Sequence, residues 1–320
     1  MRILQNVNFP FVQSRRITYV IAALALIAAV VGIFVCGLNW STDFTGGVSA
    51  VINMKPKDPG VKPLNIDQLR DVIREGGFKE SEIQFIGNPA DATFQIKVEG
   101  SDAEQIKEKI LELVRDNLDD YVKGRNLQSD VLREVNTVGA KAGAEMRTNV
   151  ITAVLIALLL MIIYIWIRFE FTFGLMAIVA LFFNVVLVVG VFAWTGKEIT
   201  MQIIAALLTI VGYAINDTIV VFDRIREDLR LYRKDPIESI FNRAINSTLS
   251  RTVITGGSTL LTAFALYFFG GAVIHDFALA IILGIVIGTL SSIFIASNLV
   301  LDTIKSTRLE QKSLKHLAKK

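Results

Sequence analysis

Asp217 is the residue in this sequence whose type and position most suggest chemistry. It lies in an apolar stretch, residues 199–222, which is about 36 Å long as a helix and therefore long enough to span a bilayer. The charged end of the stretch begins at Asp223, so Asp217 lies about 8 Å inside the apolar stretch. An aspartate side chain is too short to extend its carboxylate from there to the water at the interface. A carboxylate in a membrane helix costs about 2.5–3.5 kcal/mol on insertion scales and usually marks a pathway or relay. Asp217 is therefore a candidate proton carrier.

Polar residues at the start of another apolar stretch, residues 252–269, are the candidate partners of Asp217. They recur at helical spacing and share one side: Arg251, Thr255, Ser258, Thr259 and Thr262. Because both stretches have their charged ends on the same side of the membrane, we expect Arg251 to lie at the depth of Asp217 and to pair with it through charge or water. We therefore predict a proton relay of Asp217, Arg251 and Asn216, with Thr255, Thr259 and Thr262 as a supporting polar face.

Each of these residues also has a structural interpretation. Asp217 and Asn216 could hold helices together by hydrogen bonds across a bundle, without titrating. Arg251 lies at the start of its stretch, where a long basic side chain commonly anchors a helix at the interface. Spacing alone leaves both alternatives open.

The elements that must position these residues are six apolar stretches, typical of a polytopic α-helical membrane protein. Hydrophobic residues make up 52% of the 320-residue chain, and the net charge of +3 argues against a nucleic-acid partner. The single cysteine, Cys36, excludes a disulfide framework and a thiol-ligated metal cluster, and we expect no metal and no cofactor. The predicted spans are residues 17–38, 149–167, 171–195, 199–222, 252–269 and 277–301. In the last of them, Ala280, Gly284 and Gly288 form a small-residue face for close packing.

The distribution of basic residues predicts the orientation. Three lysines or arginines precede the first span, one separates the second from the third, seven follow the fourth and six follow the sixth, whereas Lys197 alone lies on the other side. This asymmetry places the N-terminus, residues 1–16, and the basic tail, residues 302–320, in the cytoplasm. The segment 39–148 is then extracytoplasmic.

That segment has the composition of a soluble domain. Alternating and helical patterns give the order strand, helix, strand, strand, helix, strand, which favours a ferredoxin-like α+β domain between spans one and two. It contains no histidine, cysteine, phosphate-binding loop or nucleophile elbow, so we expect a binding or mechanical module and not an enzyme.

The residue patterns of two connecting segments indicate further structural roles. The turn with Asp43, Gly46 and Gly47 joins the first span to the first strand, either as a simple glycine-rich connector or as a hinge that transmits motion. Residues 236–249 have apolar side chains on one helical face, which predicts a helix lying in the cytoplasmic membrane interface.

Several motifs along the whole chain resemble the SecD/SecF family of the resistance-nodulation-division superfamily. They are LNW at 38–40, DFTGG at 43–47, GYAINDTIVVFDRIRE at 212–227, SRT at 250–252, TLLT at 259–262, FALA at 277–280 and SSIFIAS at 291–297. The resemblance implies a multi-pass protein of the bacterial cytoplasmic (inner) membrane. It also implies that a complex with SecD, beside the SecYEG channel, uses the proton-motive force to help preproteins finish crossing. Asp217 matches the family's proton-relay aspartate, and Arg251 matches its nearby basic residue.

Two other functions remain open on the sequence. One is a half-transporter of the same superfamily that exports a small or lipidic substrate. The other is a membrane assembly scaffold that uses no energy, in which Asp217 only packs helices together.

Overall fold

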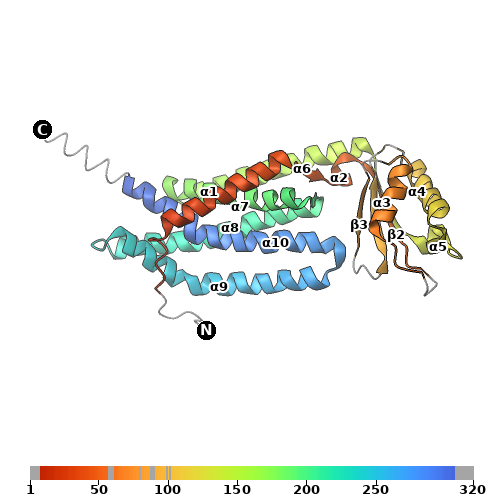
Figure 1. The fold of residues 1–320 in the computed structure, drawn as a ribbon. Helices are drawn as coiled ribbons and strands as arrows, with labels where there is room; N and C mark the ends of the chain where they lie inside the picture. Colours follow the sequence, from red (N-terminus) through yellow and green to blue (C-terminus); the bar gives the residue numbers. More distant parts are fainter. Residues whose placement is uncertain are drawn as a thin grey trace.

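Within the residues that it describes, the computed structural model has six helices long and apolar enough to span a membrane. These residues are 8–56, 61–78, 81–86, 91–98, 100 and 102–306, so residues 1–7 and most of the predicted basic tail, 307–320, lie outside them. The spanning helices are α1 (Arg15–Val35), α6 (Ala140–Arg168), α7 (Phe171–Thr195), α8 (Met201–Leu231), α9 (Ile237–Phe269) and α10 (Gly271–Ser291). After α10 the same spanning helix continues through a π-helical turn, η3 (Ser292–Ala296), and ends at Ser306. The helices form one bundle, with a sheet domain beyond one end of it (Figure 1).

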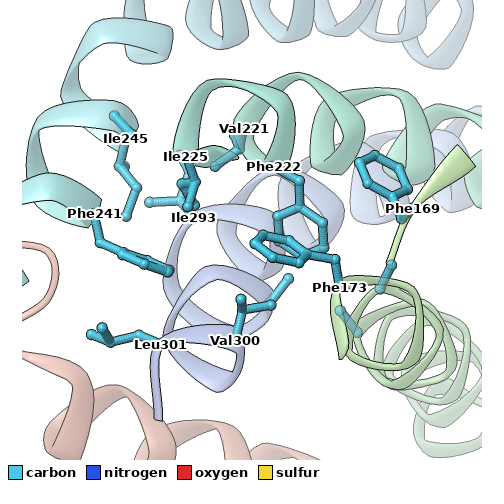
Figure 2. Close-up of a cluster of buried hydrophobic side chains, with 14 of the residues drawn as sticks. Phe169, Phe173, Val221, Phe222, Ile225, Phe241, Ile245, Ile293, Val300 and Leu301 are labelled. Carbon is cyan, nitrogen blue, oxygen red and sulfur yellow. The ribbon is translucent and has the colours of Figure 1, made fainter. Parts of the chain in front are cut away.

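The larger of the two buried hydrophobic clusters described in the bundle is centred on aromatic side chains of neighbouring helices (Figure 2). Phe222 of α8 is fully buried, and its ring meets those of Phe169 and Phe173 edge to face at centroid distances of 5.8 Å and 5.2 Å. Such aromatic pairs add about 0.5–1.5 kcal/mol beyond the burial of their surface. Ile165 of α6, Phe241 of α9 and Val300 of the last helix are buried in the same cluster, so the cluster joins five spanning helices.

Small residues in α10 allow it to approach α8 closely. A Cβ atom on Gly284 would lie 2.3 Å from the Ile210 side chain, and one on Gly288 would lie 3.2 Å from the Cβ of Ala214. Ala280, one turn earlier, is fully buried. The predicted small-residue face is therefore confirmed, and it brings α10 against the helix that carries Asp217.

The separate interfacial helix predicted for residues 236–249 is wrong. α9 runs without a break from Ile237 to Phe269, so this segment is the first part of the fifth spanning helix. Its apolar residues Phe241 and Ile245 are buried in the bundle core and do not face lipid headgroups. The prediction failed because an amphipathic pattern identifies an apolar face but does not show what covers it.

The sheet domain has four antiparallel strands in the order β3-β4-β2-β5. Helices α3 and α4 pack on the face of the sheet that points away from the bundle (Figure 1). Strand residues Phe94 and Ile96 and helix residues Leu69 and Ile110 are fully buried between these layers. In chain order the elements are β2 (Gly47–Asn53), α3 (Ile66–Glu75), β3 (Glu82–Phe85), β4 (Thr93–Val98), α4 (Ala103–Asn117), α5 (Asp119–Val122), η2 (Leu127–Val131) and β5 (Leu132–Val138).

The sheet domain is attached to the bundle at the point where α8 begins. The two-residue strand β1 (Asn39–Trp40), which follows α1, pairs in parallel with β6 (Glu198–Ile199), which precedes α8. Lys97 of β4 forms an ion pair with Glu198, and only 10% and 9% of these side chains are exposed. The attachment is thus made by both backbone pairing and a buried ion pair.

We expect the Lys97–Glu198 ion pair to hold the sheet domain in place. Lys97→Met leaves the Glu198 carboxylate buried without its countercharge, so it should lower the free energy of unfolding of the domain in the full-length protein by about 3–5 kcal/mol. The double variant Lys97→Met/Glu198→Leu removes both charges and should recover most of that loss. Urea unfolding followed by circular dichroism on detergent-solubilised protein measures both.

Lys107→Met is the matched control, because Lys107 pairs with Glu104 on the exposed surface of α4. Exposed ion pairs contribute about 0–1 kcal/mol. If Lys97→Met were no more destabilising than Lys107→Met, the buried pair would not be what holds the domain.

Candidate functional site

Asp217 lies where α8, α9 and η3 meet, and two hydroxyl groups hold its carboxylate. The Thr252 hydroxyl of α9 donates to Oδ1 and the Ser292 hydroxyl of η3 donates to Oδ2, each at 2.7 Å. Thr252 and Ser292 are buried, at 3% and 0% exposure, whereas Asp217 is half-buried. Because an ionised carboxylate only accepts hydrogen bonds, this arrangement satisfies one lone pair on each oxygen with a neutral donor.

Helix packing places the three side chains within hydrogen-bonding distance. Gly288 packs on Ala214 three residues before Asp217, and Ser292 follows Gly288 by one helical turn, so the close contact of α8 with α10 continues to the carboxylate. Gly256 of α9 lies one turn after Thr252, and a Cβ there would be 3.5 Å from the Tyr213 hydroxyl. Small residues on both neighbouring helices therefore let short hydroxyl side chains reach Asp217.

Arg251 does not pair with Asp217 in this structure. Its side chain is exposed, and among the described residues it makes no ion pair. The reason is geometric: adjacent residues in a helix point about 100° apart, and Thr252 occupies the direction toward Asp217. Arg251 lies at the expected depth but faces the outer surface of the bundle.

The rest of the predicted polar face also divides between inside and outside. Asn216, Thr255 and Thr262 are exposed on the outer surface, and the hydroxyl of Thr262 donates to a carbonyl of its own helix. Thr259 is half-buried beside the Tyr213 hydroxyl, one turn of α8 before Asp217. None of these four residues contacts the carboxylate among the interactions of the described residues.

Sequence reasoning missed Thr252 and Ser292, the two residues that touch Asp217. Thr252 is next to Arg251, and by residue type the arginine is the stronger candidate partner for a carboxylate. Ser292 belongs to an uninterrupted apolar span. The sequence pattern there does not distinguish a serine that bonds a neighbouring helix from a serine that bonds only the backbone of its own helix. A helical projection of α9 centred on Thr252 in place of Arg251 would have found the first contact but not the second.

The turn residues Asp43, Gly46 and Gly47 lie at the other end of α8. The Oδ2 atom of Asp43 accepts a hydrogen bond from the backbone N–H of Met201, the first residue of α8, at 3.5 Å. Met201 precedes Asp217 by sixteen residues, which is about 24 Å along a helix. The turn therefore contacts the helix that carries Asp217, but at the opposite end from the site.

The turn itself is folded into the short helix α2 (Thr42–Thr45), which packs against α6. Gly46 has a φ of +78°, which favours glycine, and a Cβ on Gly143 of α6 would lie 2.9 Å from the Gly46 nitrogen. Close backbone packing therefore accounts for part of the glycine content of this region. In the part of the chain that the structure describes, no group of three histidine, cysteine, aspartate or glutamate side chains could hold a metal ion.

Comparison with known proteins places this geometry in a family. Residues 120–306 match the family model described as protein export membrane protein SecD/SecF, C-terminal. The protein translocase subunit SecF of Rhodothermus marinus is 39% identical over 308 residues, which cover 94% of this chain and 95% of that protein. SecF of Thermodesulfovibrio yellowstonii is 38% identical over 319 residues, covering 97% of this chain and all of the relative.

A longer relative carries the same region as one part of a fused chain. The protein translocase subunit SecDF of Thermus thermophilus is 42% identical over 286 residues, which are 88% of this chain but 37% of that protein. The crystal structure of SecDF from Thermus thermophilus, described as a translocon-associated membrane protein, matches 95% of this chain and 40% of its own, with a TM-score of 0.81 and 37% identity. On these matches in sequence and fold, the chain belongs to the SecD/SecF family of protein export membrane proteins, and its role is in protein export.

Proposed function

We propose that this chain works with SecD, beside the SecYEG channel, to couple the proton-motive force to the late stages of preprotein translocation. The observation that carries the proposal is a carboxylate within the spanning region that is held by two hydroxyls and not by a cation. A carboxylate paired with a fixed arginine would be kept ionised, whereas one held by hydroxyls can gain or lose a proton without breaking an ion pair. In this proposal the chain is a proton-driven transport component and not an enzyme.

The energy of proton movement limits what one carboxylate can do. A charge that crosses the whole membrane gains about 2.3 kcal/mol at 100 mV, whereas changing a two-state equilibrium from 1:99 to 99:1 requires about 5.5 kcal/mol. One proton therefore biases an equilibrium that is already nearly balanced. A complete switch requires roughly two or three protons, or an added contribution from the pH gradient.

An exposed polar stripe on α9 supports SecD as the partner within the membrane. Arg251, Thr255, Ser258 and Thr262 are all exposed on this helix, and the stripe is about 16 Å long. A stripe of this length is too deep for every side chain in it to reach water, and polar side chains in the spanning region face protein or water and not lipid. A second set of spanning helices would cover it, and the region that matches this chain makes up 37% of the fused SecDF relative.

In the proposed arrangement the chain lies in the bacterial inner membrane with both termini in the cytoplasm. The start of α1 and the end of the sixth spanning helix lie at the bundle end far from the sheet domain, which supports opposite sides for the termini and the domain (Figure 1). The strand order β3-β4-β2-β5 with both helices on one face supports a ferredoxin-like extracytoplasmic domain.

The turn at Asp43, Gly46 and Gly47 has a mechanical role in this proposal. It contacts the first residue of α8, and α8 also carries Asp217, so movement of this helix would reach the sheet domain through the turn. In this proposal the sheet domain acts on the preprotein.

Asp217→Asn is the substitution that tests the proton role. Asparagine keeps the shape and hydrogen-bonding capacity but cannot titrate, so the protein should still be expressed and associate with SecD. Completion of preprotein translocation in inverted membrane vesicles should fall to the level measured without a proton-motive force. Asp217→Glu should retain part of the stimulation.

Asp223→Asn is the matched control, since Asp223 lies on the same helix and pairs with Arg168 at a partly exposed position. It should leave the stimulation intact. Full proton-dependent stimulation in the Asp217→Asn vesicles would mean that the carboxylate is structural and that the proposed function is wrong.

Labelling of introduced cysteines tests the proposed orientation. In a Cys36→Ser background, single cysteines at the exposed positions Lys123 and Lys234 should react with an impermeant maleimide from opposite sides of the membrane. With intact spheroplasts, only Lys123→Cys should be labelled from outside. Labelling of both variants from outside would contradict the orientation.

A further inference from the structure

The hydroxyl of Ser292 lies between two acceptors, which distinguishes it from the other hydroxyl at the site. It is 2.7 Å from Oδ2 of Asp217 and 3.0 Å from the backbone carbonyl oxygen of Thr289. A serine hydroxyl has one proton and can direct it fully to only one of them. The Thr252 hydroxyl, in contrast, has Oδ1 of Asp217 as its one acceptor among the described interactions.

This difference determines which carboxylate oxygen is suited to take a proton. When an oxygen of Asp217 is protonated it becomes a donor, so the hydroxyl bonded to it must accept and turn its own proton elsewhere. Ser292 can do this, because the Thr289 carbonyl is already within hydrogen-bonding distance. The Thr252 hydroxyl has no second acceptor among the described interactions, so its proton would be left unpaired, which is costly. The added proton therefore belongs on Oδ2.

The resulting rearrangement conserves every proton. A hydronium ion gives its proton to Oδ2 and is left as water, the new O–H donates to the Ser292 oxygen, and the Ser292 hydroxyl rotates its proton from Oδ2 to the Thr289 carbonyl. One O–H bond of the hydronium ion breaks, one O–H bond forms on Asp217, and deprotonation reverses each step.

Ser292 lies at the junction where the sixth spanning helix changes from α-helical to π-helical. Its backbone N–H is shared between the carbonyls of Gly288 and Thr289, η3 begins at Ser292, and the Ser297 hydroxyl donates to the Ser292 carbonyl at 2.8 Å. A hydroxyl that bonds back to its own helix can bend it, and π-helical turns are often found at functional sites. A change in the Ser292 hydroxyl thus acts on a helix junction that is already irregular.

The part of the helix after this junction is tied to two other spanning helices. Asp302 pairs with Arg15 of α1 at 3.2 Å, and Lys305 pairs with Glu238 of α9. A bend at Ser292 would therefore be transmitted to the packing of the whole bundle end far from the sheet domain.

We propose that Ser292 is a positioning residue that converts protonation of Asp217 into a change in direction of the last part of the sixth spanning helix. The inference rests on the proposed proton role of Asp217 and adds the oxygen that takes the proton, the group that responds and the helix that moves.

Ser291→Ala and Ser292→Ala form a matched pair for the test. Both serines are buried and both hydroxyls bond back to a carbonyl three residues earlier, but only Ser292 also contacts Asp217. Spin labels at Leu231→Cys and Ser306→Cys, both exposed, in a Cys36→Ser background report the position of the helix end relative to α8. The distance between them is measured by electron paramagnetic resonance in lipid nanodiscs at high and low pH.

We expect a pH-dependent change in this distance in the labelled parent and in Ser291→Ala, and its loss in Ser292→Ala and Asp217→Asn. Ser292→Cys, a near-isosteric variant with a weaker donor, should keep a reduced change and guards against misfolding of the alanine variant. A full change in Ser292→Ala together with its loss in Asp217→Asn would overturn the role of Ser292 but leave the proposed function standing. A full change in Asp217→Asn would overturn both. Equal loss in both alanine variants would show a packing effect and would also overturn the inference.

Discussion

The bundle must supply hydrogen bonds to a half-buried carboxylate in a spanning helix, where the backbone N–H groups are already bonded within the helix. Every N–H within a spanning helix is used by the helix itself, so the hydrogen bonds to Asp217 must come from side chains of other helices. Thr252 and Ser292 supply them, and short side chains can do so only if the helices are close. The tight packing of Gly284 and Gly288 against α8 is therefore a requirement of the site and not only a feature of the core.

The length of α8 connects this site to the rest of the molecule. The helix begins at the attachment of the sheet domain, passes Asp217 and ends at Leu231, beyond the aromatic cluster around Phe222. A continuous helix transmits displacement along its axis because its backbone hydrogen bonds resist compression and extension. The proposed relay thus lies on a helix whose first turn adjoins the attachment of the sheet domain, and the neighbouring helices limit how far this helix can move.

The sequence predicted the six spans, and that Asp217 lies within one of them, because both depend on composition along one helix. It did not predict the neighbours of Asp217, which depend on how three helices are rotated about their axes. Arg251 and Thr252 illustrate the problem: they are adjacent, and a rotation of about 100° decides which of them faces the carboxylate. The prediction of an interfacial helix at residues 236–249 was wrong for a related reason. An apolar helix face fits a membrane interface and a bundle core equally well, and only the fold shows that Phe241 packs inside the bundle. The π-helical turn at Ser292 has no sequence signal that distinguishes it from regular helix.

The Lys97–Glu198 pair has a consequence for how the chain is assembled during synthesis. Lys97 belongs to a domain whose strands and helices are all made before α6, whereas Glu198 follows α7. The domain can thus acquire its own core early, but Lys97 meets Glu198 only after the α6–α7 hairpin has entered the membrane. Docking of the folded domain through this ion pair therefore depends on the placement of the two spanning helices that lie between Lys97 and Glu198 in the chain. A chain whose hairpin fails to insert retains an undocked domain, and the proteases that remove incompletely assembled proteins have a longer time to cleave it.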